Sequence, residues 1–135
     1  NSVGDAIDAD FSEIKFNNIN ITNAINDCID LSSGKYYIKN ARLISCGDKS
    51  ISAGEKSSVV VENVKTVNSD IGIASKDSST VFVNNLDSIQ NNICFSAYNK
   101  KQEFWGGRIF YKKHNCIPTQ IYSDNISLIG YWNEL

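Results

Sequence analysis

Two stretches near the middle of the chain repeat each other at a fixed interval. The first reads Gly47-Asp48-Lys49-Ser50-Ile51-Ser52-Ala53-Gly54-Glu55, and the second reads Asp70-Ile71-Gly72-Ile73-Ala74-Ser75-Lys76-Asp77. Ile51 and Ile73 are 22 residues apart, and this interval continues toward both ends of the chain. It places six apolar anchor residues at equal spacing: Ile7, Ile29, Ile51, Ile73, Phe95 and Ile117. A repeat of this length is typical of a solenoid.

Each repeat contains three short runs in which apolar residues alternate with others. In the third repeat these runs are residues 51–53, 59–61 and 64–67. Alternation, together with Val, Ile and Thr, favours strands, and three strands leave no room for a helix. The sequence therefore predicts an all-β fold, a right-handed single-stranded parallel β-helix of five to six coils with three short strands per coil. Each strand would pair with its copy one coil away, about 4.8 Å along the axis.

A column of asparagines accompanies the anchors, with one extra residue between its second and third members. It consists of Asn18, Asn40, Asn63 and Asn85. We expect the column at a sharp bend between two sheets, where one residue near the left-handed region is needed and Asn tolerates it. The side-chain amides would then bond from coil to coil. In the fifth coil Gly107 takes the Asn position and meets the same backbone demand.

With this asparagine column the chain resembles the pectin-lyase-like right-handed β-helix superfamily, whose asparagine ladder Asn40, Asn63 and Asn85 match. The two stretches quoted above are similar to repeat regions of bacterial secreted or surface β-helix proteins. The resemblance implies a substrate groove on the outer face of the anchor sheet and a carbohydrate ligand. It does not choose an activity, because this scaffold serves lyases, hydrolases, epimerases, phage tailspikes and surface stalks.

Acidic residues gather on that outer face in the first two coils. Asp8, Asp10 and Asp30 make a carboxylate cluster, which suits glycoside hydrolysis or Ca²⁺ binding. A lyase would also need a cation there, and Lys76 is the nearest, two coils away. The alternative interpretation is a solvated acidic edge that discourages end-to-end association. Apart from this weak Ca²⁺ candidate, the sequence predicts no cofactor, and without a Cys-x-x-Cys it predicts no other metal site.

A second candidate ligand surface follows the anchor strands into their turns. Glu55 and Asp77 would stack as like charges, and their repulsion is tolerated only if both are exposed to water or a cation lies nearby. Tyr98 flanks the same face. These three residues are predicted to bind sugar or Ca²⁺, and the alternative is that the turn residues bond their own backbone. Among the other aromatics, Trp105 is expected in the core column of Val61 and Val83. His114, the only histidine, has no acid nearby and is a poor general base.

The 135 residues are expected to form one domain, with coils over residues 1–116 and a partial coil and cap over 117–135. Pro118 suggests that the solenoid stops there, with Tyr131 and Trp132 as a lid. The net charge is −2, and Lys and Arg are scattered along the sequence and do not form the basic cluster that a nucleic-acid binder carries, so we expect no nucleic-acid partner. No apolar run reaches the length of a membrane span.

Cysteine use leaves two interpretations open. Cys94 and Cys116 are one coil apart and would approach disulfide distance if the fifth coil keeps its register. Cys28 lies in the same column, but three coils from Cys94, which is too far for a bridge. Alternatively, all four cysteines are small buried residues.

The sequence favours a non-catalytic module of a bacterial secreted or surface protein, acting as a scaffold or a carbohydrate-binding platform. The chain begins without Met, so we expect it to be part of a larger protein. One alternative is a fragment of a polysaccharide lyase, hydrolase or epimerase acting on acidic glycans. Another is an assembly domain of the tailspike type, which would form a homo-oligomer through its coil ends or a sheet face.

Overall fold

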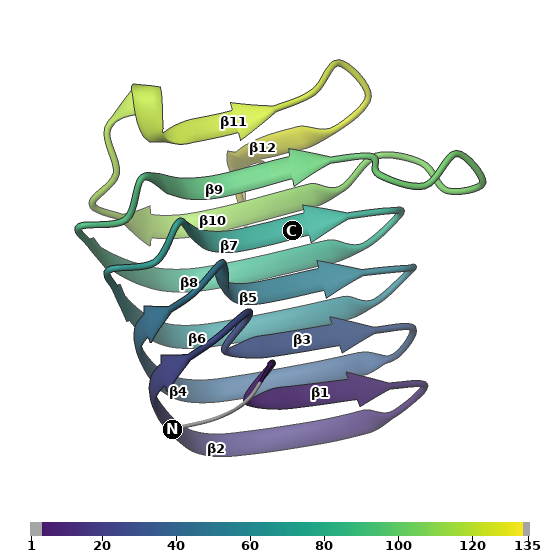
Figure 1. Cartoon of the computed structure of the whole chain (residues 1–135). Coiled ribbons are helices and arrows are strands. Elements are labelled where there is room, and N and C mark those ends of the chain that lie inside the picture. The colour runs from purple at the N-terminus through teal and green to yellow at the C-terminus, as the bar shows by residue number, and fades with distance from the viewer. Residues whose placement is uncertain (1–3, 134–135) are drawn as a thin grey trace.

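The computed structural model describes residues 4–133 and contains two six-stranded parallel sheets that wind into a solenoid of about six turns (Figure 1). The near sheet consists of β1 (Ile7–Asp10), β3 (Ile29–Ser32), β5 (Lys49–Gly54), β7 (Ile71–Lys76), β9 (Ile93–Tyr98) and β11 (Ile121–Ser123). The far sheet consists of β2 (Glu13–Ala24), β4 (Lys35–Cys46), β6 (Ser58–Val67), β8 (Thr80–Ile89), β10 (Arg108–His114) and β12 (Leu128–Tyr131).

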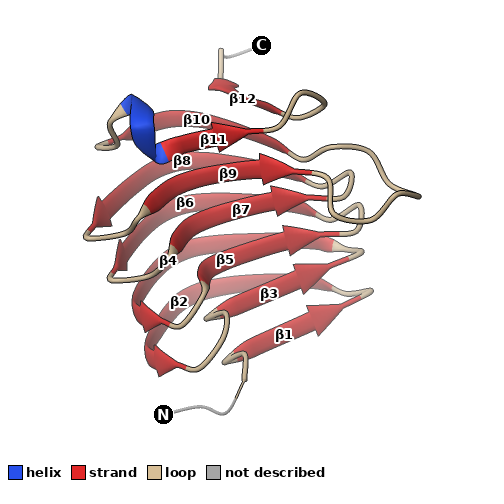
Figure 2. Ribbon diagram, turned by 45° about the horizontal axis from the view of Figure 1, so that its top comes forward, coloured by secondary structure: helices blue, strands red, loops and turns tan. Residues whose placement is uncertain are grey.

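The solenoid is right-handed. In Figure 1 the near strands run from left to right and the far strands return behind them while the chain climbs from β1 to β12. Figure 2 shows the two sheets as facing layers. The predicted fold class is therefore confirmed.

The anchor residues form one stacked column inside the solenoid. Ile7 is in register with Ile29, and the column continues through Ile51 and Ile73 to Phe95. From Ile29 to Phe95 these side chains are completely buried, between the near sheet and inward residues of the far sheet such as Val61. Each burial contributes about 1.5–3 kcal/mol, which offsets the entropy of ordering a coil.

The second and third predicted runs of each coil join into one long, curved strand. In β6 residues 59–61 and 64–67 belong to the same strand, and Asn63 lies between them. Asn40 Nδ2 donates to Asn18 Oδ1 over 3.3 Å, and Asn63 Nδ2 donates to Asn40 Oδ1 over 3.3 Å. The predicted amide ladder is thus present as far as Asn63.

The left-handed backbone positions lie elsewhere, so the predicted conformation of the asparagine column is wrong. None of the four asparagines has a positive φ; the residues that do include Asn23, Ser45, Asn68 and Gln90, which end or follow the far strands. These positions turn the chain back to the near sheet. The amide column curves within a strand and does not need that conformation.

The fifth coil shifts the register of everything after it. The loop between β9 and β10 has nine residues, whereas the loop between β7 and β8 has three. Phe95 consequently pairs with Ile121, and Ile117 is 57% exposed and is not an anchor. Gly107 is not in the asparagine column, because Asn85 lies opposite Lys113.

Two further predictions for this region are wrong for the same reason. Trp105 lies in the long loop and is 69% exposed, while Tyr111 takes the predicted position, in register with Val83. Pro118 begins a 3₁₀ turn (Pro118–Gln120), and the solenoid resumes in β11. At the C-terminal end of the solenoid Tyr131 packs against Tyr111, whereas Trp132 packs against Phe82 on the outer face of the far sheet.

Two disulfides crosslink the coils. Cys94 and Cys116 are bonded, with their Cα atoms 6.2 Å apart, although the fifth coil does not keep its register. Cys28 and Cys46 form a second bond, with a Cα separation of 5.3 Å, which the sequence did not predict. It joins the residue before β3 to the last residue of β4 and so closes one coil on itself.

Candidate functional site

The outer side of the near sheet carries most of the predicted site residues. Its strands present small residues in the middle coils, and Ser52, Ala74 and Ser96 are buried although they alternate with the inward anchors. Charged and aromatic side chains surround them. We call this surface the near face, and its residues are Asp5, Asp8, Asp30, Lys49, Lys76 and Tyr98.

Three carboxylates meet at the first two coils. Asp5, Asp8 and Asp30 each offer an oxygen within 4.8 Å of the others, which brings together two of the three predicted acids. Asp10 is exposed in the next outward row and is not part of this group. Among the described residues this is the only acidic cluster with a spacing that suits a cation, and Ca²⁺ remains a prediction there.

Asp5 was missed because it precedes the first strand. The sequence feature that could have revealed it is a column two residues before the anchors, in which Asp5, Asp27 and Lys49 follow one another at 22-residue intervals. Asp27 N donates to Asp5 Oδ1 over 2.9 Å, and Lys49 N donates to Asp27 Oδ1 over 3.0 Å. Each carboxylate thus caps the backbone of the next coil.

Cations lie beside these acids. Lys49 Nζ is 2.7 Å from Asp48 Oδ2 and 3.9 Å from Asp27 Oδ1, and the Lys49 side chain is largely buried. Lys76 extends across Gly54: a Cβ atom at position 54 would stand 3.1 Å from Lys76 Cε. The missing side chain of Gly54 therefore lets Lys76 reach back toward the acids of earlier coils.

Burial shifts the protonation of this face. The pKa of Asp30 is raised to about 6, first by burial and then by the neighbouring Asp27 and Asp5 carboxylates, while Lys76 partly opposes the shift. The pKa of Lys76 is lowered, first by burial and then by the positive charges of Lys49 and Lys100. Burial also raises the pKa of the Tyr98 hydroxyl. A carboxyl that changes charge near neutral pH is a property found often at functional sites.

Glu55 and Asp77 hold the long loop between β9 and β10. Asp77 is completely buried, and its Oδ1 accepts the backbone N–H groups of Lys100 and Lys101 over 2.7 and 2.9 Å. Glu55 Oε1 lies 2.5 Å from Lys101 Nζ. The alternative interpretation is that these turn residues bond their own backbone. Asp77 does accept backbone N–H groups, but they belong to the next coil. Ligand binding by Glu55, Asp77 and Tyr98 remains a prediction.

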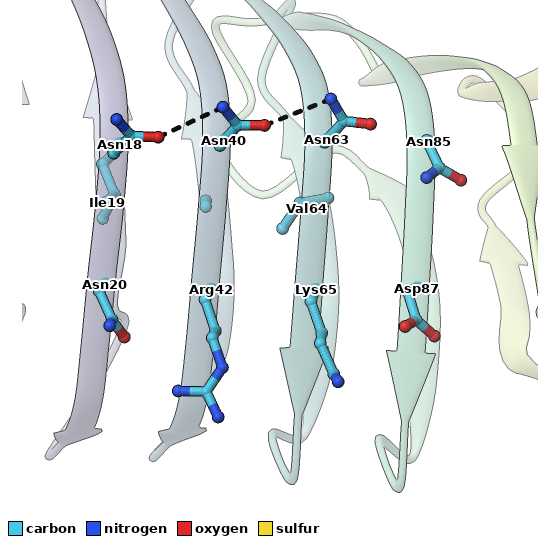
Figure 3. Close-up of a pocket in the computed structure, with 11 residues that line it drawn as sticks. Asn18, Ile19, Asn20, Asn40, Arg42, Asn63, Val64, Lys65, Asn85 and Asp87 are labelled. Atoms are coloured by element: carbon cyan, nitrogen blue, oxygen red, sulfur yellow. Dashed lines mark hydrogen bonds between the residues drawn. The ribbon is translucent and has the colours of Figure 1, made fainter.

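A groove of about 450 Å³ lies on the outer side of the far sheet, where the long strands curve (Figure 3). We call it the amide groove, and it is lined by Asn18, Ile19, Asn20, Asn40, Ala41, Arg42, Asn63, Val64, Lys65, Asn85 and Asp87. Its asparagine row is the column predicted from the sequence, but the second row changes from coil to coil, as Asn20, Arg42, Lys65 and Asp87, and therefore shows no pattern that would reveal a site.

The remaining predicted group, His114, belongs to neither surface. His114 Nδ1 accepts the backbone N–H of Cys116 over 3.0 Å, and burial lowers the pKa of its ring. It packs edge-on against Tyr111, with the ring centroids 4.5 Å apart. His114 therefore has a structural role, holding the backbone at Cys116 and packing against Tyr111.

Comparison with known proteins adds no functional assignment. No protein family matches the chain, and neither a curated protein nor a solved structure is significantly similar to it. Within residues 4–133 no helix has the length and apolar character needed to cross a membrane. What the protein does must therefore be inferred from the geometry of its surfaces.

Proposed function

We propose that the protein is a non-catalytic β-solenoid module of a secreted or surface protein, and that its near face binds carbohydrate. One observation carries the proposal: the same face of the near sheet carries three clustered carboxylates in its first two coils and, beside the small residues of β5, β7 and β9, two lysines and a tyrosine. The small residues are buried beneath the larger side chains, so a ligand would contact the charged and aromatic groups that surround them.

The chemistry of the near face suits a hydroxyl-rich ligand. The carboxylates of Asp8 and Asp30 accept hydrogen bonds from sugar hydroxyls, and the ammonium of Lys76 donates them. Tyr98, which is half-buried, adds an aromatic ring beside these groups. Because the strands repeat about every 4.8 Å along the axis, a linear polymer lying on the face would meet successive coils at regular intervals.

The two disulfides support an extracellular location. All four cysteines are paired. Disulfides persist in oxidising compartments and are rare in the cytosol.

A glycan array tests the proposal directly. We expect the wild-type protein to bind a set of glycans, and the variants Asp30→Asn and Lys76→Gln to lose about tenfold in affinity, as removal of a charged hydrogen-bond partner does. Glu103→Gln, an exposed change in the long loop, serves as the control and should bind normally. No glycan signal, or equal loss in the control, would contradict the proposal. Light scattering of the same sample tests the alternative of an assembly domain.

A second candidate function is polysaccharide cleavage, and the protonation of Asp30 favours it. With a pKa of about 6 and carboxylates close by, Asp30 suits the role of general acid toward a glycosidic oxygen. This function predicts release of reducing ends or unsaturated products from an acidic polysaccharide. Turnover should disappear in Asp30→Asn while folding is retained. Binding without any product would rule out the enzyme.

A further inference from the structure

We propose that the amide groove is a second ligand site, separate from the near face, and that it binds a linear anionic polysaccharide. This inference does not rest on the proposed function, because the groove lies on the far sheet and shares no residue with the near face.

The groove is built from two outward rows on β2, β4, β6 and β8. Strand register aligns Asn18, Asn40, Asn63 and Asn85 in the first row. It aligns Asn20, Arg42, Lys65 and Asp87 in the second row. Figure 3 shows the rows running side by side across the four strands, with Ile19 and Val64 between them. The groove therefore follows the solenoid axis and repeats with the strand spacing of about 4.8 Å.

Two adjacent cations give the groove its charge. Arg42 and Lys65 are register neighbours, and both side chains are exposed. Within residues 4–133 neither forms an ion pair. The acid at the end of the row, Asp87, accepts a hydrogen bond from Asn115 Nδ2 over 3.0 Å. Asp87 is the register neighbour of Lys65, but within residues 4–133 it forms no ion pair with it, so the two cations are available to an anionic group.

The amide row supplies hydrogen-bonding groups on the other side. In the ladder Asn40 bonds through both its Nδ2 and its Oδ1, whereas Asn18 Nδ2 and Asn63 Oδ1 have no partner in the described part of the chain. Asn85 lies beyond the last ladder bond, and no dashed line reaches it in Figure 3. These donors and acceptors match the hydroxyl groups of a sugar.

A polysaccharide fits this arrangement better than a nucleic acid does. One hexose unit is about as long as the strand spacing, so successive sugars would meet successive coils. The Arg42 guanidinium is a planar fork that binds carboxylate or sulfate through two parallel hydrogen bonds. Nucleic-acid binding draws on many phosphate contacts, whereas the groove has two cations and the chain carries a net charge of −2.

Titration with defined polymers tests the site. Isothermal titration calorimetry would measure binding of polygalacturonate, dextran sulfate and uncharged dextran at about 0.15 M ionic strength, where surface charges act over ~8 Å. The double variant Arg42→Gln/Lys65→Gln should bind the anionic polymers about tenfold more weakly. The matched control, Lys15→Gln/Lys35→Gln, removes the same charge from exposed positions of β2 and β4 outside the groove and should change affinity less than about twofold.

The outcomes separate this site from the near face and from other ligands. Loss in the groove variant alone, with binding retained in Asp30→Asn and Lys76→Gln, supports the proposal even if the near face binds nothing. Equal loss in the control, or no binding of either anionic polymer by the wild type, overturns it. Tighter binding of a DNA duplex than of the polysaccharides, lost in the same groove variant, would overturn it in favour of a nucleic-acid site.

Discussion

Lys76 lies across Gly54, so that its Cε atom would be 3.1 Å from a Cβ atom placed at position 54. This relationship gives a glycine in a parallel strand a specific purpose. A side chain at Gly54 would lift Lys76 away from the sheet and from the carboxylates that its charge influences. The near face thus depends on a residue that offers no functional group.

Gly54→Val should displace Lys76 and weaken carbohydrate binding at the near face. Overpacking at this position should also cost about 1–3 kcal/mol of the free energy of unfolding. Gly130→Ala is the matched control, because nothing lies within 4 Å of a Cβ atom at that position. Glycan affinity and urea unfolding measure the two effects. Normal binding by a folded Gly54→Val protein would show that the position of Lys76 does not matter.

Asp30 should make the stability of the protein depend on pH. Its folded pKa of about 6 lies above the ordinary value of 3.8, so the folded state binds the proton more tightly than the unfolded state. The stabilising contribution is therefore present below pH ~4 and is lost as the pH rises through about 6. After a discount for solvent screening, the change is about 1–2 kcal/mol.

Urea unfolding of the wild type and of Asp30→Asn at a series of pH values between about 4 and 7 measures this contribution. We expect the stability difference between the two proteins to shift in favour of Asp30→Asn as the pH rises. Asp10→Asn, an exposed acid outside the cluster, controls for the general charge effect. A stability difference that is constant with pH would mean that Asp30 titrates normally.

The bond between Cys28 and Cys46 should be a major source of stability. It closes a segment of 18 residues, and crosslinks of this length contribute about 3 kcal/mol. Cys28→Ala/Cys46→Ala should lose that amount in denaturant unfolding, with Cys94→Ala/Cys116→Ala as the comparison. Free thiols in the native protein, detected by alkylation and mass spectrometry, would contradict the pairing.

Asp77 should determine the order of the long loop between β9 and β10. Asp77→Ala removes the acceptor of two backbone N–H groups and should destabilise the protein by about 2 kcal/mol. Amide exchange of residues 99–107 should accelerate most. Asp77→Asn keeps one acceptor oxygen and should retain part of the protection. Unchanged exchange in Asp77→Ala would show that the loop is held by other contacts, such as that of Lys101 with Glu55.

The sequence predicts what repeats inside the solenoid and little of what varies outside it. The anchors from Ile7 to Phe95 could be placed because burial selects the same kind of residue in every coil. Ile117 was misplaced because the loop after β9 lengthens the period, which leaves no trace in the apolar pattern until Ile121.

The functional surfaces were harder to predict because they depend on side-chain reach. Asp8 and Asp30 share a column and could be paired, but the approach of Lys76 requires the absence of a side chain at Gly54. The pairing of Cys28 with Cys46 was missed because a comparison of columns relates neighbouring coils and not the two ends of one coil.

Nuclear magnetic resonance titration with an uncharged oligosaccharide that binds on the array tests the central claim most directly. We expect the largest amide shifts at the near face, in Asp30, Ser52, Lys76 and Tyr98, with small shifts along the amide groove. Shifts confined to the amide groove, or no saturable shifts at all, would contradict carbohydrate binding by the near face.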